Sequence, residues 1–253
     1  MISRRGIKSI SAKCDMLMHM HREVYDKQAA ILETIEENQE IFEDVISRNT
    51  DKIIESIHDK NKSFEKHINL KTCQEFYHGH MGVKLWAKLD EDTKKYLLLG
   101  KHLDTTNQYS PSDECGFIAI EYALAIENEF KRKLVDNFLS KAPHIEFKTA
   151  EGIKSITPSS RMTLGEICLL LDKARKVKDS RDLLWPFVSF VQKHTVGGHK
   201  IIDYKNALFD IKNKYRNPAA HPSNYTREML DAFKELMFDK GFIKGYLDAI
   251  QTK

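Results

Sequence analysis

The chain has 253 residues, 41% of them hydrophobic and 30% charged, with a formal net charge of only +3. This length suffices for one large or two small domains with a real core and a heavily charged surface. The 11 glycines and 6 prolines are too few for the many turns of an all-β sandwich or a nucleotide-binding α/β fold, so helices are favoured.

The N-terminus is basic, but no apolar stretch follows it, so it does not look like a secretory signal. No apolar run approaches the ~20 residues that span a membrane. The four cysteines lie far apart and form no Cys-x-x-Cys pair, which indicates neither a zinc knuckle nor a disulfide framework. We therefore expect a cytoplasmic protein with reduced thiols and no membrane partner.

Residues 1–70 are predicted to form a long helical arm, because they contain no proline and no glycine after Gly6. Apolar residues recur there at multiples of seven: Leu17, Val24, Ile31 and Val45. Asn38 occupies the position of this repeat between Ile31 and Val45. Such a helix would be up to ~90 Å long at ~1.5 Å per residue. It is either a coiled coil, formed with itself or with a second copy, or an amphipathic helix lying on its own globular domain.

Residues 71–110 are predicted to be a helical connector. Within it, His78 and His80 are a candidate metal pair, but two such histidines point apart on a helix and no third ligand is close in sequence. A helix is expected from Trp86 to Leu99, with Gly100 as the residue that ends it.

Residues 111–253 are predicted to form an all-α helical bundle. Ser112 or Asp113 would cap the first helix, whose apolar residues lie on one face as far as Phe138. Pro143 would then end this helix.

The rest of the bundle is predicted from local signals. Thr163 and Glu166 have the spacing of a capping box at the start of a helix. A short β-hairpin is expected, with residues 145–147 in one strand and 153–156 in the other. Three further helices are expected at 183–194, 204–215 and 226–250.

Charge is distributed unevenly along the chain. Residues 23–59 are mainly acidic, whereas basic residues outnumber acidic ones between Lys131 and Arg216. The basic half is a candidate for contact with a polyanion, and the run Lys173–Lys178 is a candidate for RNA binding without cleavage. The alternative is that these charges are solvated helix faces. Because the two parts have opposite charge, the acidic arm is also a candidate restraint on the basic domain.

The segment Arg216-Asn217-Pro218-Ala219-Ala220-His221 is the candidate functional centre. Asn217 before Pro218 is typical of an N-cap followed by proline, so we expect the helix to break or kink here. On a straight helix Arg216 and His221 would lie about 140° apart, and a kink could bring both to one face. The two alanines would leave that face shallow and uncrowded.

These side chains suit metal-independent RNA cleavage. A histidine, with an unperturbed pKa of ~6.5, can take a proton from the ribose 2′-OH or give one to the leaving 5′-oxygen. A guanidinium can hold two oxygens of the phosphorane, and Asn217 could orient His221 or bind a phosphate oxygen. The structural alternative is that Arg216 pairs with an acidic neighbour and that Asn217-Pro218 only links two helices.

The segment resembles the Arg-x(4–6)-His motif of the HEPN superfamily, in which a polar residue commonly follows the arginine. The helix Ala123-Leu124-Ala125-Ile126-Glu127-Asn128-Glu129 is similar to the first helix of HEPN domains, where an acidic residue often faces the motif. The resemblance covers roughly residues 111–250. It implies a HEPN-like bundle in which Arg216 and His221 are the catalytic pair, Asn217 supports them, and Glu127 is the facing acidic residue.

The same resemblance implies a function. Similar members are metal-independent endoribonucleases that need no cofactor and act in toxin–antitoxin, abortive-infection or antiphage systems. They form homodimers or higher oligomers, so that two motifs share one cleft. RNA would be the substrate, and a regulatory protein a further partner. Other members have lost catalysis, so the alternative function is a non-catalytic helical interaction protein that acts as a scaffold, partner-binding or regulatory module.

Overall fold

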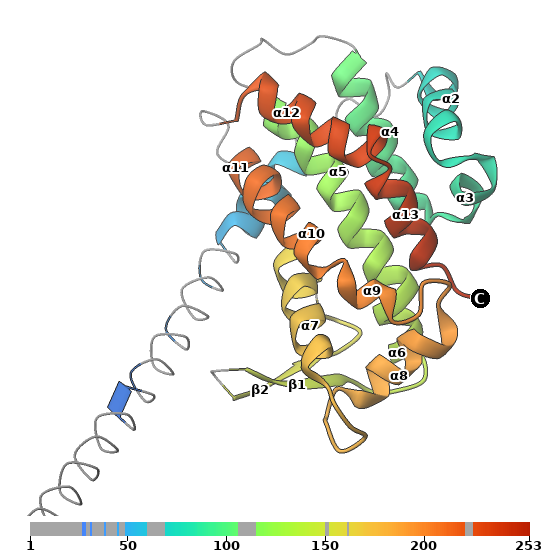
Figure 1. Ribbon diagram of the computed structural model, residues 1–253. Helices are drawn as coiled ribbons and strands as arrows, with labels where there is room; N and C mark the ends of the chain where they lie inside the picture. The colour runs from blue at the N-terminus through green and yellow to red at the C-terminus, as the bar shows by residue number, and fades with distance from the viewer. Residues whose placement is uncertain are drawn as a thin grey trace, which may run out of the picture. The chain divides into compact units, whose positions relative to one another are not determined.

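The computed structural model describes residues 27–28, 31, 38, 45, 49–59, 69–105, 115–149, 152–160, 162–220 and 225–253. The chain divides into two compact units, Met1–Val45 and Ile46–Lys253. In the first unit the described residues are helical and exposed, including Ile31 and Val45, whose place in a coiled coil stays a prediction. The second unit is all-α, as expected, and its described strands form a single hairpin (Figure 1).

The first described residues of the second unit, 49–59, are helical and bury Ile54 and Ile57. Three helices follow: α2 (Leu70–Met81), α3 (Val83–Lys88) and α4 (Glu91–Thr105). They belong to the same compact unit as the helices after residue 110. The domain boundaries at residues 70 and 110 stay predictions.

The single helix expected from Trp86 to Leu99 is two helices in the structure. It breaks after α3, and α4 then runs through Gly100 to Thr105, so the prediction that Gly100 ends a helix is wrong. A Cβ atom at Gly100 would lie 2.6 Å from the ring of Tyr122. Glycine is therefore required because α4 lies very close to α5 (Cys115–Phe130).

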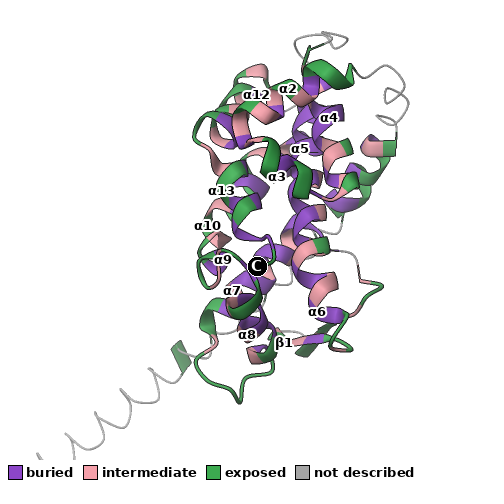
Figure 2. Cartoon of the chain, turned by 90° about the vertical axis from the view of Figure 1, so that its right-hand side faces the viewer, coloured by how far each residue is buried: buried purple, intermediate pink, exposed green. Residues whose placement is uncertain are grey.

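Helix α5 is the central helix of the unit, and η2 (Lys131–Asp136, π-helical) and α6 (Asn137–Leu139) continue it. Figure 2 shows buried residues along α4 and α5. On α5 the burial extends around the helix and includes Glu121, Glu127 and Glu129. The expectation of a single apolar face is therefore wrong, because neighbouring helices enclose α5 on several sides.

Two predictions from local sequence are confirmed after α6. Strands β1 (Ile145–Thr149) and β2 (Gly152–Ile156) form an antiparallel hairpin. Helix α7 (Leu164–Lys176) begins with the expected capping box. The Thr163 hydroxyl accepts a hydrogen bond from the Glu166 amide, and the Glu166 carboxylate accepts one from the Thr163 amide.

The C-terminal part of the unit consists of α8 (Trp185–His194), α9 (Lys200–Asp203), α10 (Lys205–Ile211), η3 (Lys212–Arg216), α11 (Asn217–Ala219), α12 (Arg227–Lys234), η5 (Glu235–Asp239) and α13 (Phe242–Ala249). Both η3 and η5 are π-helical. The single helix expected at 226–250 is interrupted at Gly241, whose φ of 70° is left-handed and favours glycine.

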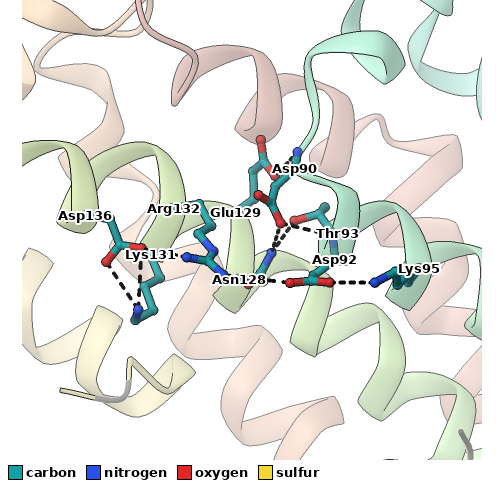
Figure 3. A network of polar contacts seen from close by, with 9 residues as sticks. All are labelled: Asp90, Asp92, Thr93, Lys95, Asn128, Glu129, Lys131, Arg132 and Asp136. Atoms are coloured by element: carbon teal, nitrogen blue, oxygen red, sulfur yellow. Dashed lines mark hydrogen bonds and ion pairs between the residues drawn. The ribbon is translucent and has the colours of Figure 1, made fainter. Parts of the chain in front are cut away.

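A network of hydrogen bonds and ion pairs connects the start of α4 to α5 (Figure 3). The Asn128 amide donates hydrogen bonds to the side chains of Asp90 and Thr93, both at 2.9 Å. The buried carboxylate of Glu129 accepts one from the Asp90 amide at 3.0 Å. Burial works to raise the pKa of Asp90, but hydrogen bonds from Asn128 and the Asp92 amide hold that pKa below its ordinary value. The junction between α3 and α4 is thus fixed against the central helix.

Candidate functional site

The segment from Arg216 to Ala219 is helical, so the chain does not break at Asn217-Pro218, and the helix ends at Ala219 instead. Asn217 has helical dihedral angles (φ −68°, ψ −45°), so it is not the N-cap that the sequence predicted. Its amide donates to the carbonyl of Lys212, five residues earlier, as the last bond of η3. Pro218 has no N–H, and its ring would crowd a carbonyl of a regular α-helix, so the wider π turn accommodates it.

The guanidinium of Arg216 is enclosed, with 0% of the residue exposed. Its Nη2 forms ion pairs with Asp51 and, at 3.2 Å, with Glu127, and its Nη1 donates to the Asn217 side-chain oxygen at 3.3 Å. Its Nε has no hydrogen-bond partner among the described residues. A buried cation is tolerated when it is paired and hydrogen-bonded, and two carboxylates and an amide supply partners for Nη1 and Nη2.

The shallow, open face expected around the two alanines is not found. Ala219 and Ala220 are buried, and α5 lies directly against them. A Cβ atom at Gly116 would come within 2.6 Å of the Ala219 carbonyl oxygen, so glycine on α5 lets the two helices touch. The expectation of an uncrowded site is therefore wrong for this conformation, because the small residues serve close helix packing.

Three of the four predicted site residues come together: Arg216, Asn217 and Glu127. Glu127 also accepts a hydrogen bond from the Leu164 amide at 2.9 Å, so it joins the start of α7 to Arg216. The fourth residue, His221, lies outside the described residues. The pairing of Arg216 with acidic neighbours is what the structural alternative expected, and the catalytic roles stay predictions.

The helix at residues 49–59 supplies a partner that the sequence analysis missed. Asp51 pairs with Arg216 although 165 positions separate them in the chain. The acidic character of residues 23–59 pointed to this part of the chain as a candidate restraint. No pattern distinguishes Asp51 from the other acidic residues there, because a pairing over such a separation has no local signature.

A second polar contact holds the same helix on α5. Nδ1 of His58 lies 3.0 Å from both carboxylate oxygens of Glu121, which is 0% exposed. Seven residues separate His58 from Asp51, so the two lie on one face of the helix, about two turns apart. Ile54, between them, is buried in the core. We call residues 49–59 the covering helix.

A cavity of about 560 Å³ lies between the covering helix, α4 and α5. Its walls include these charged and polar residues: Glu55, His58, Asp59, Glu127, Asn128 and Lys131. Carboxylates outnumber the lysine among these lining residues, so the cavity is poorly suited to a phosphate group.

Cys168 lies on α7 close to the Arg216 cluster. Burial raises the pKa of its thiol to about 12, and the positive charges of Lys212, Lys205 and Arg216 lower it less strongly. The thiolate is the nucleophilic form of cysteine. Burial therefore favours the neutral thiol of Cys168 over the thiolate.

The described residues contain no group of three or more His, Cys, Asp or Glu side chains placed to hold a metal ion. On α2, Nδ1 of His80 lies 2.9 Å from the carbonyl oxygen of Phe76, within its own helix. None of the helices in the described ranges is long and apolar enough to cross a membrane.

The chain matches no protein-family model, no curated protein and no solved structure. The HEPN assignment therefore stays a proposal, which rests on the segment from Arg216 to His221 and on its surroundings.

Proposed function

We propose that the chain is a metal-independent endoribonuclease that cleaves RNA by attack of a ribose 2′-OH on the adjacent phosphate. The observation that supports this function is the convergence of Arg216, Asn217 and Glu127 in one cluster. Arg216 binds the phosphate, His221 transfers a proton, and Asn217 supports them. The HEPN resemblance adds a role as an antiphage or toxin effector and a homodimer in which two motifs share one cleft.

In this reaction the 2′-oxygen loses its proton to a base and forms a bond to phosphorus, while the bond to the 5′-oxygen breaks and that oxygen takes a proton. The products carry a 2′,3′-cyclic phosphate and a 5′-hydroxyl. His221 carries the proton in one of these transfers. Negative charge builds on the non-bridging oxygens, and a guanidinium can donate parallel hydrogen bonds to two of them. Glu127 holds the guanidinium of Arg216 in place.

The covering helix has to move before this chemistry can occur. Asp51 presents a carboxylate to Arg216, and a carboxylate offers the guanidinium two oxygens as a phosphate does. Asp51 and an RNA phosphate cannot bind the same N–H groups together. We therefore propose a latent enzyme that becomes active when the covering helix leaves Arg216.

The test compares RNA cleavage by the wild type and by Asp51→Ala in buffer that contains EDTA, below the unfolding temperature of both. We expect Asp51→Ala to cleave faster and to leave 2′,3′-cyclic phosphate ends. Adding Arg216→Ala or His221→Ala should abolish this cleavage while circular dichroism shows that the helices persist. The proposal fails if Asp51→Ala leaves RNA intact, or if cleavage survives the loss of Arg216 and His221.

A second candidate function is a non-catalytic helical interaction protein. The enclosure of Arg216 between Asp51 and Glu127 favours it, because a purely structural cation needs the same partners. It predicts that His221→Ala leaves the biological function intact. Changing the exposed Ile31 and Val45 to aspartate would then abolish that function by removing an apolar contact surface.

A further inference from the structure

A hollow of about 610 Å³ lies at the C-terminal end of α7, beside β1 and the loop that leads into α8. Five basic residues line it: Lys148, Lys173, Lys176, Lys178 and Arg181. They come from β1, from α7 and from the loop, so the sequence run that ends at Lys178 contains only part of the cluster. We call this feature the basic hollow.

Acidic residues balance the basic hollow only in part, since Asp172 pairs with Lys176 at 2.9 Å from outside the lining, and two carboxylates line the hollow against five cations. Both carboxylates already have partners. Asp179 accepts a hydrogen bond from Arg181 at 2.9 Å, and Asp182 accepts one from a backbone amide two residues further on at 2.9 Å. Lys148 and Lys178 are exposed and have no carboxylate partner among the described residues. The hollow therefore presents positive charge to solvent.

Helix stability explains some of this charge. Lys173 and Lys176 lie in the last turn of α7, where cations stabilise the negative end of the helix dipole. Lys148 lies on β1 and Lys178 beyond the end of α7, so the dipole accounts for neither. Cations from separate stretches that line one hollow fit a ligand with several negative charges.

We propose that the basic hollow binds the phosphate backbone of an RNA strand. Lysines act as flexible point charges that contact phosphates without reading bases, so the binding has little sequence preference. A hollow accommodates a strand, whereas a membrane presents a flat charged surface. This binding needs no cleavage and therefore goes beyond the proposed function.

The position of the hollow relative to Arg216 is set by α7. The helix has 13 residues, a length of about 20 Å at ~1.5 Å per residue. Its first residue, Leu164, is hydrogen-bonded to Glu127, the partner of Arg216, and its last turn lines the hollow. The basic hollow and the Arg216 cluster therefore lie at opposite ends of α7, about 20 Å apart.

The test measures fluorescence anisotropy of a labelled single-stranded RNA of about 12 nucleotides with the full-length chain at several salt concentrations. The variant Lys148→Glu/Lys178→Glu is compared with Lys193→Glu/Lys244→Glu, which makes the same charge change at exposed lysines outside the hollow. Each phosphate contact on a single strand adds about 0.7 to the steepness with which the logarithm of the binding constant falls with the logarithm of salt concentration. Losing two contacts therefore weakens binding roughly 25-fold at ~0.1 M salt. The control should stay within about twofold of the wild type, because distant charges are screened.

Equal binding by the two double variants would overturn the proposal. So would displacement of the RNA by polyglutamate as effectively as by unlabelled RNA, since this would identify an acidic peptide as the ligand. Displacement by a mononucleotide at equal phosphate concentration would also contradict it. If the hollow binds RNA while Asp51→Ala cleaves none, the hollow is supported and the proposed ribonuclease function is lost.

Discussion

Changing Asp51 to alanine should lower the free energy of unfolding by about 2–3 kcal/mol, because one of the carboxylates that enclose Arg216 is lost. Breaking a buried pair costs about 3–5 kcal/mol when the remaining charge is left alone. Here Glu127 remains at 3.2 Å from Arg216, and the Asp51 side chain is 11% exposed, so water can reach its place. For a protein of this size the loss corresponds to a fall in Tm of roughly 4–12 °C.

Urea and thermal unfolding followed by circular dichroism would measure this change. Asp210→Ala is a matched control, since it also removes an aspartate from an ion pair, with Lys214 at 3.1 Å. Both side chains of that pair are more than half exposed, and such pairs contribute about 0.5 kcal/mol or less. If Asp51→Ala costs no more than Asp210→Ala, Arg216 is not held by a buried charge pair and the reasoning is wrong.

A double-mutant cycle separates the pair from other effects of each substitution. Arg216→Ala alone leaves the carboxylates of Asp51 and Glu127 near each other without their cation, which is unfavourable. Adding Asp51→Ala relieves part of that repulsion. We expect a coupling energy of about 1–3 kcal/mol between the two positions. Strictly additive losses would show that Asp51 and Arg216 do not interact directly.

Three further predictions follow from single contacts. The pKa of Asp90 is lowered in the folded protein, so its stabilising effect is present above the unfolded pKa of ~3.9 and is lost as pH falls through the folded pKa. Asn128→Ala lacks a hydrogen bond to that carboxylate, so between about pH 6 and pH 3 its free energy of unfolding should fall less than that of the wild type. Equal falls in the two proteins would contradict this. Cys168 should resist iodoacetamide at about pH 8 until the protein unfolds, and fast labelling of the native protein in mass spectra would refute its burial. Gly116→Ala should lower the free energy of unfolding, measured with urea, by about 1–3 kcal/mol. Gly79 on α2 has open space around it, so Gly79→Ala should raise that free energy by up to ~1 kcal/mol. Similar effects of the two substitutions would exclude the close contact at Gly116.

Elements with a local cause could be predicted from the sequence. The capping box at Thr163 depends on side chains within a few residues, and it is found. Local reasoning failed where a distant contact determines the residue. Gly100 is a glycine because of Tyr122 rather than to end a helix, and Asn217 stays helical because a π turn accommodates the following proline.

The candidate site was predictable only in part for the same reason. The motif contained Arg216 and Asn217, and the family resemblance pointed to Glu127 as the facing carboxylate. Asp51 was missed, and His58 with it, because both reach the central helix only through the tertiary fold. Residues on a distant helix leave no periodic trace in the sequence near their partners, so burial of the site could not be inferred from the motif.

The covering helix limits how the proposed enzyme could be activated. Burying Ile54 and Ile57 is worth about 1.5–3 kcal/mol for each side chain, in addition to the Asp51–Arg216 pair, so the open form lies several kcal/mol above the closed form. These contributions sum to about 5–9 kcal/mol, so a ligand that opens most molecules must prefer the open form by a factor of roughly 10⁴–10⁶. Asp51→Ala removes about 2–3 kcal/mol of this difference, which should raise basal cleavage roughly 30- to 150-fold at ~1.4 kcal/mol per factor of ten. Stability loss and activity gain then arise from one contact and should agree in size. A loss of stability without any gain in cleavage would mean that Asp51 only stabilises the fold.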